Sequence, residues 1–116
     1  MSKILMLKSK IHDAIVTETE LDYEGSITID KELMDSANLF PFELVHVLNK
    51  NNGARFETYV IEGKPGGKEI CLNGPASRLA QKGDVLMILS YAMVDVDELS
   101  NWEPAIIRLD SENNSL

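Results

Sequence analysis

The chain has 116 residues, of which 44% are apolar and 26% charged, which predicts one domain with a modest core. The 19 acidic and 11 basic residues give a net charge of −8, which would repel a phosphate backbone and argues against nucleic-acid binding. No apolar run approaches the roughly 20 residues of a membrane-spanning helix, and the opening residues are too short for a signal peptide. We therefore expect a cytoplasmic protein with no membrane partner.

Short β-rich segments separated by Gly, Asn, Asp and Pro recur along the chain, and no helical period is sustained, which predicts a mainly β protein. A barrel is favoured for so many short strands, because closing the sheet leaves no edge unpaired. The expected strands, in chain order, are Ile4–Leu7, Ile11–Thr17, Ser26–Ile29, Glu43–Asn49, Arg55–Ile61, Glu69–Leu72, Val85–Tyr91 and Ala105–Leu109.

A few short helices are expected between these strands. Asp30 can cap one over Lys31–Ala37, because its carboxylate can accept from the first free N–H groups. Proline suits a first helical turn, so a second is expected over Pro75–Ala80, and a third can follow Asp95.

Two further local patterns concern a turn and the end of the chain. Asn51-Asn52-Gly53 supplies residues that accept positive φ, which predicts a hairpin between the flanking strands. The last seven residues, 110–116, are polar and acidic, which predicts a frayed tail.

The side chains that could carry metal chemistry are few. Cys71 is the only cysteine, which excludes an internal disulfide and a cysteine-cluster metal site, and it is interpreted as a small core residue. His12 and His46 are too far apart in sequence to form a metal-ligand motif. No metal is expected.

Between Met6 and about Leu109 the chain resembles the aspartate decarboxylase family. Each matching motif is common, but their order and spacing are specific: Lys10-Ile11-His12, Tyr23-Glu24-Gly25-Ser26, Asn52-Gly53, Arg55-Phe56, Thr58-Tyr59, Asn73-Gly74 and Gly83-Asp84. The resemblance implies that the single domain 1–116 is a double-psi β-barrel. It also implies that the domain cleaves itself into a small chain, 1–25, and a larger chain, 26–116.

The resemblance implies a cofactor made from the chain itself at Gly25-Ser26. Gly25 lacks a Cβ and can adopt strained backbone angles, and the Ser26 hydroxyl can attack its carbonyl, which converts the amide into an ester. Elimination then leaves a dehydroalanine, which hydrolyses to ammonia and a pyruvoyl group. That ketone condenses with a substrate amine and accepts electrons as carbon dioxide leaves, so no pyridoxal phosphate is needed.

Four further residues take roles by resemblance. The Thr58 hydroxyl contacts the oxyanion formed during cleavage and touches the substrate, and the Tyr59 hydroxyl donates the proton after decarboxylation. Lys10 and Arg55 hold the carboxylates of L-aspartate, Arg55 through its planar fork and Lys10 as a compact charge.

A loop completes the implied substrate site. It comprises Asn73, Gly74, Pro75 and Ala76, and it departs from the family's usual run of alanines at Pro75. Proline has no N–H, so any contact that needs an amide at this position is lost.

Strand geometry raises a difficulty for this site. Alternation puts Arg55 and Tyr59 on one face and Thr58 on the other, so the three cannot converge from one regular strand. A bulge, a strand end or a neighbouring subunit would resolve this, and the family pattern of homotetramers with sites between subunits favours the last.

The implied reaction is the decarboxylation of L-aspartate to β-alanine, for pantothenate and coenzyme A synthesis. Two alternatives stay open: a non-catalytic β-barrel binding module, and the same chemistry on glutamate, since a pocket altered at Pro75 could admit one more methylene. A maturation helper for cleavage is a further open partner.

Overall fold

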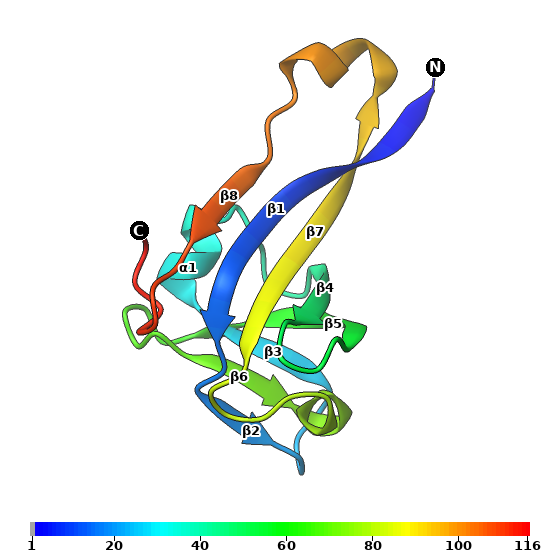
Figure 1. The fold of residues 1–116 in the computed structure, drawn as a ribbon. Coiled ribbons are helices and arrows are strands. Elements are labelled where there is room, and N and C mark those ends of the chain that lie inside the picture. Colours follow the sequence, from blue (N-terminus) through cyan, green and yellow to red (C-terminus); the bar gives the residue numbers. More distant parts are fainter. Residues whose placement is uncertain (1) are drawn as a thin grey trace.

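The structure is a computed structural model that describes residues 2–116, and it is built mainly from eight strands of one sheet (Figure 1). The predicted mainly β class is therefore confirmed. No helix within 2–116 is long and apolar enough to cross a membrane. The elements in chain order are β1 (Lys3–Ile15), β2 (Glu18–Glu20), β3 (Ser26–Asp30), α1 (Lys31–Ser36), β4 (Leu44–Asn49), β5 (Arg55–Gly63), β6 (Ile70–Asn73), the 3-10 helix η1 (Gly74–Arg78), β7 (Val85–Asp95), the 3-10 helix η2 (Val96–Asn101) and β8 (Ala105–Arg108).

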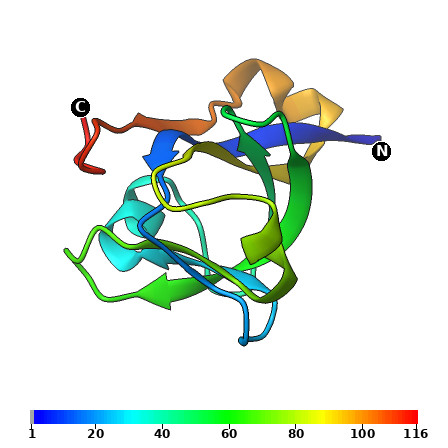
Figure 2. The ribbon, with the colours of Figure 1, turned by 60° about the horizontal axis from the view of Figure 1, so that its bottom comes forward.

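The chain itself, and not a ladder between edge strands, brings the ends of the sheet together. The strand order is β2-β6-β3-β5-β4-β7-β1-β8, so β1 and β2 lie near opposite ends. Only Val16 and Thr17 separate these two strands in sequence. The Thr17 N–H donates to the Ile70 carbonyl at 2.8 Å and the Val16 N–H to the Asp84 carbonyl at 2.9 Å. The strands consequently surround a common centre (Figure 2).

Alternate side chains of the strands fill that centre. Ile11, Ile27, Val47 and Ile88 are fully buried, one each on β1, β3, β4 and β7. Helix α1 adds its apolar side to the same core, and the Asp30 carboxylate accepts from the Glu32 N–H at 2.9 Å, as predicted for its cap. The other side of each strand faces outward, because side chains alternate along a strand.

Strands β1 and β7 differ most from their predicted bounds, because both continue into an arm. The expected strands Ile4–Leu7 and Ile11–Thr17 are one strand, β1, because its pairing with β7 continues across the polar residues between them. The register shifts twice along this pair, and Asp13 at the second shift has a φ of 68°. Beyond the barrel, β1 and β7 form an arm that carries η2 at its end (Figure 1).

The predicted hairpin is confirmed. Strands β4 and β5 pair antiparallel from Leu44↔Tyr59 to Leu48↔Arg55 without a register shift. Gly53 in the connecting turn has a φ of 76°, which glycine adopts at no steric cost.

The prediction of a frayed tail is wrong, because Asn113 anchors it. Its side chain is 1% exposed; Oδ1 accepts from the Ile15 N–H at 2.8 Å, and Nδ2 donates to the carbonyls of Ile15 and Lys68 at 3.0 and 3.1 Å. A polar composition gave no sign that one amide would pair with backbone groups at the end of β1. The tail is held by hydrogen bonds and not by apolar burial.

Replacing this amide should measurably destabilise the fold. We expect Asn113→Gly, which tolerates the residue's φ of 59°, to lower the free energy of unfolding by about 1–3 kcal/mol, because three buried backbone groups lose their partner. Urea denaturation at fixed protein concentration measures this change. The exposed neighbour Glu112 provides the control variant, Glu112→Ala. If this variant loses as much free energy of unfolding as Asn113→Gly does, the anchoring role of Asn113 is contradicted.

Candidate active site

The outer face of β6 and β3 is polar and yet buried. Ser26 pairs with Asn73 and Thr28 pairs with Cys71, so these four side chains lie together on one face. The residues between them, Ile27 and Leu72, point into the core. Helix η1 packs against β2, β3 and β6 at this end of the barrel. Buried polar groups need hydrogen-bond partners, and these four side chains supply them to one another.

Ser26 is the first residue of β3 and is 1% exposed. Its Oγ accepts a hydrogen bond from Asn73 Nδ2 at 3.0 Å and donates to the Glu24 carbonyl at 3.4 Å. The hydroxyl is thus held from both sides, with its hydrogen directed back toward the segment that precedes Gly25. The structure thus places Asn73 in direct contact with Ser26.

Gly74 lies against the Gly25-Ser26 segment at a distance that only glycine permits. Its φ is 66°, and a Cβ there would lie 2.6 Å from the Tyr23 carbonyl oxygen and 2.8 Å from the Gly25 nitrogen. On the other side, Pro75 Cδ is 3.8 Å from where a Cβ of Gly25 would lie. Gly25 therefore lies next to both Gly74 and Pro75.

The loop after β6 differs slightly from the predicted helix over Pro75–Ala80. It forms the 3-10 helix η1 from Gly74, with Pro75 in its first turn and Ala76 buried. The structure thus places Asn73, Gly74 and Pro75 beside Gly25 or Ser26.

Strand β5 carries Thr58 and Tyr59 past the start of β3. Ile27 pairs with Val60 in a parallel ladder, so the preceding residues, Ser26 and Tyr59, fall side by side on the outer face. Thr58 points to the other face and pairs with the core residue Val45. The predicted alternation is observed, and the β4–β5 ladder has no bulge that would remove it.

The two predicted substrate cations are not brought together with Ser26. Lys10 lies on β1, and β7, β4 and β5 separate that strand from β3. Arg55 is exposed at the far end of β5, with its Nη2 3.5 Å from His46 Nδ1. It also lines a cavity of about 320 Å³ that Ser26 does not reach.

Lys10, Arg55, Tyr59 and Ser26 nevertheless share the outer face. Lys10 is in register with Leu89 and His46, and Arg55 is in register with Leu48 and Met87 on the same side. The outer face of a barrel is convex, so side chains on distant strands diverge there. Lys10 and Ser26 therefore lie on the same face but on strands that are not neighbours.

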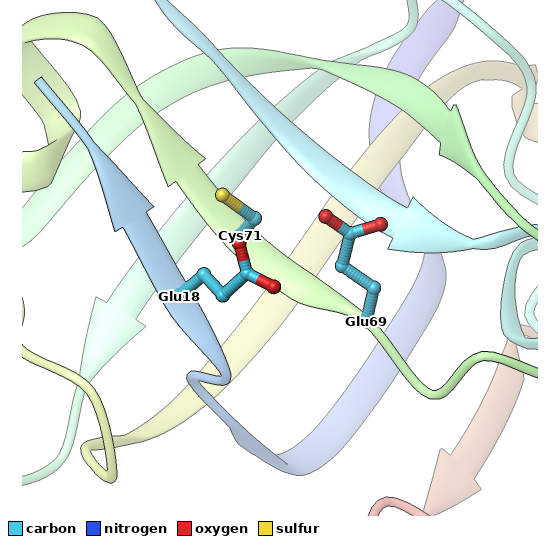
Figure 3. Close-up of side chains that lie close together, drawn as sticks. All are labelled: Glu18, Glu69 and Cys71. Atoms are coloured by element: carbon cyan, nitrogen blue, oxygen red, sulfur yellow. The ribbon is translucent and has the colours of Figure 1, made fainter.

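Cys71 has two carboxylates beside it, from Glu18 on β2 and from Glu69 just before β6 (Figure 3). One ligand atom from each lies within 4.8 Å of the others. Burial raises the pKa of Glu69, and the charge of Glu18 raises it further. Burial also raises the pKa of the Cys71 thiol to about 11, and the carboxylates add to this effect.

At neutral pH Cys71 is therefore a protonated thiol, and it donates to Asn73 Oδ1 at 3.3 Å. The interpretation of Cys71 as a small buried residue is correct, but it missed this polar contact. Thr28, which accepts from Asn73 Nδ2 at 2.9 Å, was missed as well. The sequence did contain a signal for both contacts. Cys71 and Asn73 are two residues apart, as are Ser26 and Thr28, so each pair shares one face of its strand.

Comparisons with known proteins agree with this site. The family model described as aspartate decarboxylase matches residues 2–116. The aspartate 1-decarboxylase of Syntrophomonas wolfei is 57% identical over 109 residues, which cover 94% of this chain and 92% of that protein. The one of Thermoanaerobacter pseudethanolicus is 56% identical, covering 93% and 92%, and the one of Parabacteroides distasonis is 50% identical, covering 97% of both.

Matches of this extent leave no room for a non-catalytic binding module, and the relatives' names specify aspartate and not glutamate. The chain belongs to the aspartate decarboxylase family, has that family's double-psi β-barrel fold, and is a carboxy-lyase that converts L-aspartate to β-alanine and carbon dioxide for pantothenate synthesis.

Proposed function

We propose that the chain becomes active by cutting its own backbone between Gly25 and Ser26, giving chains 1–25 and 26–116, and that Ser26 is converted into a pyruvoyl cofactor. The observation that carries this proposal is the buried Ser26 hydroxyl at the start of β3, held by Asn73 at 3.0 Å. This hydroxyl is directly bonded to the Cβ of the residue that follows Gly25, so it is the nucleophile next to the bond to be cut. No metal and no pyridoxal phosphate are part of the proposal.

The first step of maturation uses the chain's own atoms. Ser26 Oγ forms a bond to the Gly25 carbonyl carbon, the Gly25-Ser26 amide bond breaks, and the hydroxyl proton ends on the freed nitrogen. Gly25 has no side chain to obstruct the approach, although Pro75 lies beside it. The resulting ester then loses the Ser26 Cα proton as its Cβ–Oγ bond breaks, which frees the Gly25 carboxylate and leaves a dehydroalanine. Water adds to this residue, and ammonia leaves to give the ketone.

Thr58 is proposed as the donor to the oxyanion on Gly25. Its side chain leaves β5 on the face opposite to Ser26, which at first counts against this role. Peptide carbonyls, however, lie in the plane of a sheet and point toward the neighbouring strand. A hydroxyl on β5 can therefore reach an oxygen at the start of β3 from either face.

Tyr59 is proposed as the proton donor of the decarboxylation itself. The pyruvoyl ketone supplies a carbonyl that binds the substrate amine and accepts the electron pair released with carbon dioxide. The Tyr59 hydroxyl then delivers a proton to the carbon that lost its carboxylate. The position of Tyr59 beside Ser26 in the β3–β5 register supports this role. The centroids of the Tyr59 and Phe42 rings lie 6.1 Å apart. Backbone groups of Asn73, Gly74 and Ala76 line the same site.

The substrate site is proposed to lie between subunits of a homotetramer. Arg55 is four residues from Tyr59, about 13 Å along the strand, a span that a long side chain can shorten. Three strands lie between those of Lys10 and Ser26 within one chain, and we propose that a neighbouring subunit provides Lys10 instead. Exposed apolar side chains suit such contacts, both beside Tyr59 and on the arm: Phe40, Phe42, Leu44, Ile4, Leu5 and Met93.

The compartment follows from the chemistry. We place the protein in the cytoplasm, because its substrate is a primary metabolite and its only thiol stays free.

Cleavage should depend on the Ser26 hydroxyl. We expect the wild-type protein to separate after Gly25 into two chains, with the larger one lighter than its serine-started sequence and reactive toward hydrazine. Ser26→Ala should stay intact and inactive, while the exposed Ser36→Ala should mature normally. Intact-mass spectrometry measures all three. A Ser26→Ala protein with full activity would refute the assignment, and a wild-type chain uncut after warm incubation would contradict unassisted cleavage and call for a maturation helper.

The phenol of Tyr59 should matter for turnover and not for maturation. Tyr59→Phe should cleave normally and lose about 10²–10⁴-fold in kcat, because the proton donor is gone. Mass spectrometry and release of carbon dioxide measure the two effects. Tyr23→Phe, an exposed phenol before the cleavage site, is the control. Normal turnover by Tyr59→Phe would remove this residue from the mechanism.

A shared site predicts complementation between two inactive variants. Lys10→Ala lacks the substrate cation and Ser26→Ala lacks the ketone, so each alone should be inactive. When the two are co-expressed, roughly one site in four should combine an intact Lys10 with an intact pyruvoyl group from different subunits. Activity of the mixed tetramers, compared with a mixture of separately purified proteins, measures this. Co-expressed subunits as inactive as either parent would place Lys10 and Ser26 in the same chain's site.

A further inference from the structure

We propose that Cys71 is a positioning residue for self-cleavage, which orients the Asn73 carboxamide so that its N–H, and not its oxygen, faces Ser26. This inference rests on the proposed cleavage at Gly25-Ser26. It adds to that proposal a residue that does not touch the reacting bond.

The contacts of Asn73 define the orientation. The Cys71 thiol donates to Oδ1 at 3.3 Å, while Nδ2 donates to Thr28 Oγ1 at 2.9 Å and to Ser26 Oγ at 3.0 Å. Cys71 and Asn73 are 2% and 3% exposed, so water does not compete for these bonds. The two ladder pairs Ser26↔Asn73 and Thr28↔Cys71 keep the four side chains on one face.

Of the partners of Asn73, Cys71 best distinguishes the two orientations of the amide. Rotation by 180° exchanges the carboxamide oxygen and nitrogen at little steric cost. The hydroxyls of Thr28 and Ser26 can each donate or accept, so they tolerate either orientation. A thiol is a poor acceptor, so a flipped amide would turn its N–H groups toward a sulfur that satisfies them badly.

Burial keeps the Cys71 thiol a donor, and the two carboxylates beside it act in the same direction. A thiolate would accept hydrogen bonds and would favour the flipped amide. Burial, helped by Glu69 and Glu18, keeps the thiol pKa at about 11, so the S–H is retained at neutral pH.

The orientation matters for the first covalent step. As Ser26 Oγ bonds to the Gly25 carbonyl carbon, it gives up its hydrogen, which ends on the Ser26 nitrogen when the amide bond breaks. A hydrogen bond donated by Asn73 stabilises the negative charge that Oγ acquires on the way. A carboxamide oxygen in that position would instead accept a hydrogen bond from the Ser26 hydroxyl. That bond would hold the proton away from the departing nitrogen.

The test compares side chains of similar size at position 71, one without a hydrogen-bond donor and one with a donor. Cys71→Val removes the donor and keeps a small apolar side chain, whereas Cys71→Ser keeps a donor. We expect Cys71→Val to slow self-cleavage of the purified precursor by about three- to tenfold, because the carboxamide oxygen loses its donor and turns toward the hydroxyls of Ser26 and Thr28. Cys71→Ser should stay within about twofold of the wild type, because a hydroxyl satisfies either orientation and about half of the amides then keep their N–H toward Ser26. Cleavage is timed by intact-mass spectrometry, with wild-type precursor run in parallel.

Two measurements separate positioning from folding. Thermal unfolding of each variant in a Ser26→Ala background, where nothing is cut, reports stability alone. Leu72→Val changes the core side of the same strand and should reduce stability without slowing cleavage. If Cys71→Val does not fold, Cys71→Ala replaces it.

The outcomes are distinct. Slow cleavage by Cys71→Val with rescue by Cys71→Ser supports the inference. Wild-type cleavage rates in Cys71→Val, equal slowing in Cys71→Ser, or equal slowing in Leu72→Val would each overturn it. A wild-type precursor that never cleaves overturns the proposed function, and this inference with it.

Discussion

The hydrogen bond from Asn73 to the buried Ser26 hydroxyl is the contact on which the rest of the site depends. It joins two strands that are far apart in sequence, β3 and β6, at the point where the chain enters the barrel from an exposed loop. Neighbouring residues hold this hydrogen bond in place. Gly74 brings the backbone of η1 against Gly25, and Thr28 and Cys71 occupy the remaining hydrogen-bonding groups of Asn73.

This arrangement puts polar chemistry on the outside of a barrel whose inside is entirely occupied. Ile11, Ile27, Val47 and Ile88 fill the centre, so no substrate can enter there. The outer face is convex, and its cations diverge from Ser26 along the sheet. In the proposed homotetramer, a second copy of the chain supplies the opposing wall of the pocket and Lys10.

The places where sequence-based expectation failed share one cause. The break predicted within β1 and the frayed tail at 110–116 were both inferred from local polarity. In the structure, long-range pairing with β7 carries β1 across its polar residues. Asn113 likewise uses its polarity to satisfy the backbone of Ile15 and Lys68. Hydrogen bonds between distant segments are invisible to a local pattern, whereas turns, caps and alternation are local, and the Asp30 cap and the hairpin at Gly53 were predicted correctly.

The sequence by itself determined the class of the fold and the family. Motif order is a property of the chain alone, and the family resemblance that it carries named Ser26, Asn73, Gly74, Thr58 and Tyr59 as candidate site residues. Only the tertiary structure decided which of these touch and which lie strands apart. Contacts such as those of Cys71 and Thr28 with Asn73 depend on the register between separate strands, and that register is set by packing of the whole barrel.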